Sequence, residues 1–94
     1  MKLAVVIGQV VSTVKYGGFE QDRLLAVDMI GPDGKRQGDI HVATDGIGAG
    51  NGEWVLVVQG SSARKTISGE VPIDMSVIGI IDEVVIENKV LFHK

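Results

Sequence analysis

The sequence contains no cysteine, only two prolines and only four aromatic side chains, one Trp, one Tyr and two Phe. The lack of cysteine excludes a disulfide framework, a thiolate zinc site and a cysteine nucleophile, and it is compatible with a reducing cytoplasm. Basic residues are not in excess either, because the formal net charge is -3. Nucleic acids and anionic membranes are normally bound by a basic face. No apolar run is long enough for a signal or membrane-spanning helix, so we expect a soluble intracellular protein without either partner.

What the sequence does have is apolar, β-branched surface. Hydrophobic residues make up 45% of the 94 residues, and valine and isoleucine dominate them. A chain of this length without a Pro- or Ser-rich linker is expected to form one domain, residues 1–94, with a thin core. The excess of apolar strand residues over what a small monomer can bury predicts a homo-oligomer.

Alternating apolar residues and turn signals predict an all-β fold. Gly8 and Gly79 mark expected bulges, the segment 31–34 is an expected hairpin turn, and Ser61 or Ser62 can cap one helical turn. This pattern is typical of a small closed antiparallel β-barrel, OB-like, with one short helical turn. The expected strands cover residues 2–14, 22–30, 39–44, 53–59, 74–86 and 90–92.

A glycine-dense loop precedes the most apolar expected strand, with glycine at positions 46, 48, 50 and 52. The dinucleotide fingerprint GxGxxG fails at its third glycine, and a strand follows where the fingerprint requires a helix. The segment 59–66 ends in Lys-Thr but lacks the glycines of a phosphate-binding P-loop. We therefore interpret the loop as a β–β connection whose glycines permit close backbone contact.

The remaining candidates for chemistry are few. His41 and His93 lie near no nucleophile motif, and no cluster of residues has the spacing of a metal site, so no catalytic residue, cofactor or metal is expected. Asp45 and Glu53 flank the glycine loop and could form an acid–base pair. The simpler interpretation is that Asp45 caps backbone amides of the loop and that Glu53 pairs with a cation such as Arg64. An OB-like module that binds single-stranded nucleic acid or another ligand remains the alternative function, although aromatics are few.

Over nearly its whole length the chain resembles the vertex proteins of bacterial microcompartment shells, typified by carboxysome and ethanolamine-utilisation members. Its C-terminal residues and the Trp after Glu53 look most like the ethanolamine-utilisation branch. The blocks that carry the resemblance are Met1-Lys2-Leu3-Ala4-Val5-Val6 with Gly8, Ile47-Gly48-Ala49-Gly50-Asn51-Gly52-Glu53-Trp54-Val55, Gly60-Ser61-Ser62-Ala63-Arg64, and Asp74-Met75-Ser76-Val77-Ile78-Gly79-Ile80-Ile81-Asp82.

The resemblance implies a structural role without catalysis. Members of this family are small β-barrels that form pentamers and close the vertices of a shell of hexameric proteins in the bacterial cytoplasm. By this resemblance, the loop residues Ile47, Gly48, Ala49, Gly50, Asn51 and Gly52 are expected near the fivefold axis, lining a narrow opening. Glu53, Ser61, Ser62 and Arg64 are expected to support that loop or to contact a neighbouring subunit. A large side chain at Ala49 or Gly50 is then expected to weaken the ring.

Overall fold

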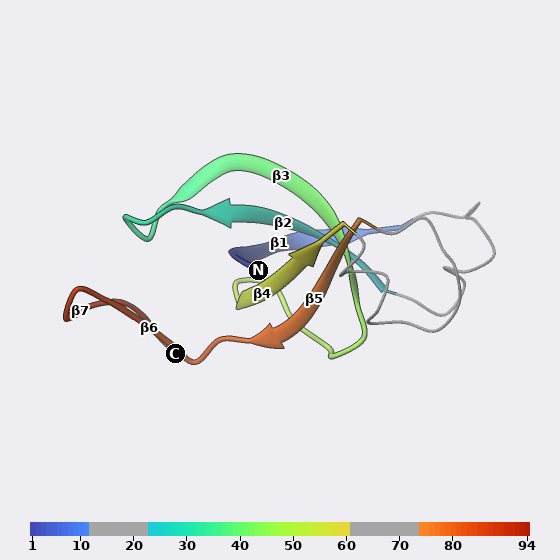
Figure 1. The fold of residues 1–94 in the computed structure, drawn as a ribbon. Coiled ribbons are helices and arrows are strands. Elements are labelled where there is room, and N and C mark those ends of the chain that lie inside the picture. The colour runs from blue at the N-terminus through green and yellow to red at the C-terminus, as the bar shows by residue number, and fades with distance from the viewer. Residues whose placement is uncertain (12–22, 61–73) are drawn as a thin grey trace.

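The computed structural model describes residues 1–11, 23–60 and 74–94, and all regular structure in these ranges is β-strand (Figure 1). The expected helical turn begins in segment 61–73, outside the described residues. The strands are β1 (Lys2–Val10), β2 (Arg23–Ile30), β3 (Arg36–Asp45), β4 (Trp54–Gln59), β5 (Met75–Ile80), β6 (Glu83–Ile86) and β7 (Lys89–His93).

Five strands close a barrel in the order β1-β2-β3-β5-β4. Four of the five contacts are antiparallel, whereas β3 pairs with β5 in parallel, through Thr44 with Ser76 and Asp45 with Val77. The prediction of a closed barrel is confirmed, but the strand pairs are not all antiparallel. Because strand direction must alternate around an antiparallel ring, a closed ring of five strands requires at least one parallel pair.

Both expected bulges are found next to their glycines. The register of β1 against β2 shifts between Val6 and Gly8, and that of β5 against β4 shifts at Gly79. The expected long strand 74–86, however, is two strands. β5 ends at Ile80, and the buried Ile81 turns its amide to the carbonyl of Trp54 at 2.8 Å, so the chain leaves the barrel before β6 begins.

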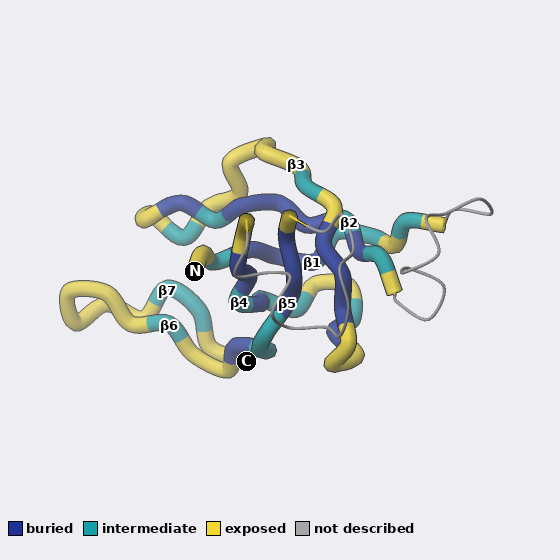
Figure 2. The backbone as a smooth tube through the Cα atoms, turned by 45° about the vertical axis from the view of Figure 1, so that its right-hand side comes forward, coloured by how far each residue is buried: buried dark blue, intermediate teal, exposed yellow. Residues whose placement is uncertain are grey.

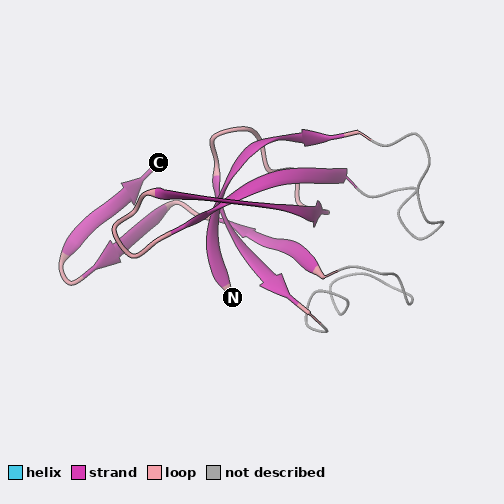
Figure 3. Cartoon of the chain, turned by 90° about the horizontal axis from the view of Figure 1, so that it is seen from above, coloured by secondary structure: helices cyan, strands magenta, loops and turns pink. Residues whose placement is uncertain are grey.

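β6 and β7 form a separate two-stranded sheet, which projects from the barrel. Glu87 and Asn88 join the two strands and both have positive φ, at 51° and 64°. Positive φ at both central residues is the geometry of a type I′ turn, whose twist suits a tight hairpin. Seen from above, this hairpin and the β2–β3 turn extend from the same end of the barrel (Figure 3).

The core residues lie on the barrel strands and the glycine loop, and the buried stretches of the chain are dark blue in Figure 2. Residues at alternate positions of each strand point inward, and branched side chains such as Leu25, Val27 and Val57 are almost completely buried. Ala49 joins this core from the glycine loop. The core cluster consists of Ala4, Val6, Leu25, Val27, Met29, Ala43, Ala49, Val55, Val57, Met75 and Val77.

The charged side chain of Asp28, on β2, is buried on the outside of the sheet with 1% of it exposed. Its carboxylate accepts hydrogen bonds from Arg36 Nε at 2.8 Å and from the Asp39 amide at 3.0 Å. The hydrogen bond from Arg36 is the main reason that the pKa of Asp28 lies below its usual value, although burial opposes the shift. Asp28 thus holds the β2–β3 hairpin beside its bulge.

Replacing Asp28 with asparagine is expected to lower the Tm at pH 7 by roughly 5–10 °C, because the charge-assisted bond to Arg36 is lost. The folded-state pKa lies below the usual 3.8, so folding favours the ionised form. The contribution of the ionised Asp28 to the stability of the fold is complete at a pH well above 3.8. It is lost as the pH falls below 3.8 through the pKa of the folded state. Differential scanning calorimetry from pH 7 to pH 2 should therefore show a smaller fall in Tm for D28N than for wild type. An equal fall in Tm for the two proteins would contradict this role of Asp28. Asp39→Asn, at an exposed neighbouring position, is the control and should change the Tm at pH 7 much less.

Candidate functional site

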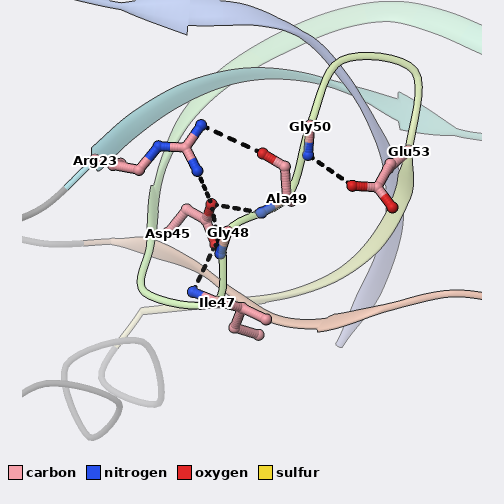
Figure 4. A network of polar contacts seen from close by, with 7 residues as sticks. All are labelled: Arg23, Asp45, Ile47, Gly48, Ala49, Gly50 and Glu53. Carbon is pink, nitrogen blue, oxygen red and sulfur yellow. Dashed lines mark hydrogen bonds and ion pairs between the residues drawn. The ribbon is translucent and has the colours of Figure 1, made fainter.

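The glycine loop leaves the barrel at Asp45, the last residue of β3, and the carboxylate of Asp45 organises its first half (Figure 4). Oδ1 accepts the amide of Ile47 at 2.9 Å, and Oδ2 accepts that of Ala49 at 2.8 Å. The amide of Gly48 lies 3.2 Å from both oxygens. The prediction that Asp45 caps the loop amides is confirmed. Three amides already occupy the Asp45 carboxylate, which argues against the alternative that Asp45 forms an acid–base pair with Glu53.

Arg23, at the start of β2, completes this arrangement. It lies opposite Asp45 in the β2–β3 register, and its Nη1 lies 3.3 Å from Asp45 Oδ2 while its Nη2 donates to the Ala49 carbonyl at 3.4 Å. The Asp45 side chain is fully buried, whereas that of Arg23 is 45% exposed. A buried carboxylate with a cation and three amide donors is well satisfied, so these contacts hold this end of the loop against the barrel. No local sequence pattern points to Arg23, because it meets Asp45 only through the strand register.

The second half of the loop is held by Glu53. Its Oε1 accepts the Gly50 amide at 2.7 Å, and its Oε2 lies 2.8 Å from Lys94 Nζ. The Lys94 hydrogen bond is the main cause that lowers the pKa of Glu53, and the Gly50 amide adds to the shift. Glu53 raises the pKa of Lys94 in return. In the described structure Lys94 is thus the cation that pairs with Glu53, while the expected partner Arg64 lies outside the described residues.

Residues 50–53 form a tight turn, in which the Glu53 amide donates to the Gly50 carbonyl at 3.2 Å. Gly52 has a φ of +84°, as the third position of a type II turn requires, and its amide donates to the Val6 carbonyl at 2.8 Å. Gly48 also has positive φ, at +99°. The amides of residues 47–50 and 52 all bond within the chain, so this loop does not offer them to a phosphate.

 The side chain of Ala49 is fully buried and packs in the barrel core, so it does not face an opening. The side chains that the loop presents outward are those of Ile47, which is 49% exposed, and Asn51. A large residue at position 49 would therefore disturb the core of its own subunit, because overpacking a core costs about 1–3 kcal/mol. The expectation that a large residue at this position weakens the ring stays a prediction, and a disturbed subunit core would be its physical basis.

Trp54 anchors the C-terminal hairpin beside this loop. Its ring stacks on that of Phe92 with centroids 4.5 Å apart and an interplanar angle of 16°. Ser61, Ser62 and Arg64 lie outside the described residues. Within the three described ranges, no group of three or more His, Asp or Glu side chains could hold a metal ion, and no helix is long and apolar enough to cross a membrane.

A family model described as "Ethanolamine utilisation protein EutN/carboxysome" matches residues 1–82. The chain belongs to this family. The bacterial microcompartment shell vertex protein EutN of Escherichia coli K12 is 57% identical over 95 residues, which cover all of both chains. The match extends over the barrel, the glycine loop and the hairpin, and it confirms the resemblance seen in the sequence.

Solved structures of the family share the fold. Gloeobacter violaceus CcmL superposes with a TM-score of 0.94 at 40% identity, over 100% of this chain and 98% of that one. A Rhodospirillum rubrum protein, GrpN, described as a pentameric microcompartment shell protein, superposes with a TM-score of 0.80 at 43% identity, over 87% of this chain and 95% of that one. The EutN/CcmL relatives are structural shell proteins, which favours the shell interpretation over a nucleic-acid-binding module.

Proposed function

We propose that this protein is a structural vertex protein of a bacterial microcompartment shell, of the ethanolamine-utilisation type or a related one. It assembles as a homopentamer, caps the vertices of the shell in the bacterial cytoplasm, contacts hexameric shell proteins there and catalyses no reaction. The full-length identity of 57% to a shell vertex protein carries this proposal. The pentameric state of the GrpN relative supports the stoichiometry.

The surface of the single chain supports assembly independently. Apolar side chains that a stable monomer would normally cover are half exposed on β3 and on the C-terminal hairpin. Cyclic rings bury such surface through a heterologous interface, in which two different patches of each subunit contact its two neighbours. Among the residues that the structure describes, the exposed large apolar ones are Met1, Val11, Ile40, Val42, Ile47, Val85, Ile86 and Val90.

Within this pentamer the proposal places Gly48–Gly52 near the fivefold axis, where the loop lines a narrow opening. A loop rich in glycine is suited to such a position, because five copies can approach closely without colliding side chains. Asp45 and Glu53 fix the loop from its two ends, so its shape is set before assembly. Ser61, Ser62 and Arg64 are proposed to support the loop or to contact the neighbouring subunit.

Native mass spectrometry of the purified protein, together with sedimentation velocity, tests the proposal. We expect a single species with the mass of five copies of the 10.0 kDa chain. Co-expression with a hexameric shell protein should then give closed particles in electron micrographs, and omission of this protein should leave them open at the vertices. A stable monomer would contradict the proposed function.

A further inference from the structure

The hairpin of β6 and β7, residues 83–93, is an arm that extends away from the barrel (Figures 1 and 3). It pairs with no barrel strand and forms a sheet of its own. A two-stranded sheet has little stability in water unless one of its faces packs against something else. The exposure of the two faces of the arm therefore shows where packing contacts are missing within a single subunit.

Each face of the arm carries a cross-strand apolar pair. At the base Phe92 lies opposite Val84 in the register and stacks on Trp54 of the barrel. Closer to the tip Val90 lies opposite Val85, and the register shifts between Val84 and Val85. Because these consecutive residues of β6 point to opposite faces, Val85 and Val90 lie on the face opposite to that of Phe92. Val85 and Val90 are 50% and 56% exposed. The arm thus presents a half-exposed apolar pair on the face that is turned away from the Trp54 stack.

The arm is also held at a fixed angle. The Ile81 amide donates to the Trp54 carbonyl at 2.8 Å, and the Lys94 amide donates to the Asp82 carbonyl at 2.8 Å. Lys94 Nζ in turn contacts Glu53. These bonds fix both strands at the base of the arm, and the stacking of Phe92 on Trp54 adds to them. The tip is therefore presented in a defined direction, which lowers the entropy that docking would cost.

A second unpartnered apolar pair lies on the other side of the barrel. Ile40 and Val42 are on β3, two residues apart and hence on one face, and they are 51% and 48% exposed. Their neighbour Ala43 points into the core and is 1% exposed. In Figures 1 and 2 the arch of β3 lies above the barrel and the arm lies below it. The chain thus carries two apolar pairs of similar exposure on opposite sides.

We propose that the arm docks on a second copy of this chain, with Val85 and Val90 packed against Ile40 and Val42 of that copy. This inference rests on the proposed homopentamer and specifies how its subunits are joined. A closed ring requires each subunit to carry two different complementary patches, one for each neighbour. The two apolar pairs satisfy that requirement, because each is incomplete within its own subunit and they lie on opposite sides.

The test uses one lysine substitution in each patch, Val90→Lys in the arm and Val42→Lys on β3. Both side chains are about half exposed in the single chain, so the subunit should keep its fold and its Tm. Each substitution places a charge in the proposed contact, and we expect it to weaken every contact of the ring by at least about tenfold. Native mass spectrometry at a series of protein concentrations should show each variant mainly as monomer where wild type is a pentamer.

Mixing the two variants gives a sharper result. The arm of V42K is intact and the β3 surface of V90K is intact, so one contact can form between them, but neither remaining patch can extend the assembly. We therefore expect the mixture to form a 1:1 heterodimer, while each variant alone does not dimerise. A mixture without heterodimer would show that the two patches are not the two halves of one contact and would overturn the inference.

Val11→Lys is the matched control, because Val11 is 81% exposed and belongs to neither patch. It should remain a pentamer, and dissociation of V11K to the same extent would overturn the assignment to these patches. A pentameric V90K would also overturn it while leaving the proposed function intact. If V90K stays pentameric but no longer closes shells with the hexameric protein, the arm contacts that protein instead. A monomeric wild-type protein would contradict the proposed function itself.

Discussion

Replacing Asp45 with alanine should lower the free energy of unfolding by about 3–5 kcal/mol, because it removes the carboxylate on which a buried network converges. Three loop amides would lose their partner, and the guanidinium of Arg23 would lose its carboxylate. Urea unfolding at one fixed protomer concentration measures the change, since the stability of an oligomer depends on that concentration. Amide hydrogen exchange should also become faster at Ile47, Gly48 and Ala49.

Asp33→Ala is the matched control for this prediction. Asp33 caps a turn as well, with its Oδ1 accepting the Lys35 amide at 3.0 Å, but the contact is exposed. Water can satisfy that amide in the variant, so a loss within about 1 kcal/mol is expected. Equal losses for D45A and D33A would show that the buried network does not hold the glycine loop.

The capping role of Asp45 could be predicted from the sequence because it is local. An aspartate directly before a run of small residues commonly accepts backbone amides two to four positions on. The bulges at Gly8 and Gly79 were predictable for the same reason, since glycine inside an apolar strand marks a local irregularity. Each of these features depends on residues close together in the chain.

Arg23 and Lys94 could not be predicted, because their roles depend on long-range arrangement. Arg23 meets Asp45 only through the register of β2 against β3, and the register cannot be read from either strand alone. Lys94 reaches Glu53 only because the chain leaves the barrel after Ile80 and returns along β7. The apolar pattern of residues 74–86 is continuous through this exit, so it predicted one strand instead of two.

The inward orientation of Ala49 could not be predicted from the sequence either. The alternation of glycine with other residues indicates close packing, but it does not indicate which side chain points inward. Three amide contacts to Asp45 turn the loop so that Ala49 enters the core, while Ile47 and Asn51 face outward. The family resemblance identified the loop as a unit, and the structure separates its core residue from its exposed ones.

Replacing Asn51 with tryptophan should abolish the pentamer without destabilising the subunit, if Gly48–Gly52 lies at the fivefold axis. Asn51 is exposed in the single chain and occupies the second position of the turn over residues 50–53, which accepts most residues. Five indole rings at an axis lined by a side-chain-poor loop would collide. Native mass spectrometry should show monomer, and the unfolding free energy of that monomer should match within about 1 kcal/mol that of the monomeric V42K subunit.

Gly46→Trp separates a position at the axis from a general effect of a large side chain on the loop. Gly46 is exposed, a Cβ there would meet nothing within 4 Å, and it lies outside Gly48–Gly52. The G46W protein should therefore remain a pentamer. Ala49→Leu makes the opposite comparison, because its overpacked core should destabilise the subunit itself by about 1–3 kcal/mol. A fully assembled N51W pentamer would contradict the placement of Gly48–Gly52 at the axis. It would not bear on the docking of the arm on β3, which V90K and V42K test separately.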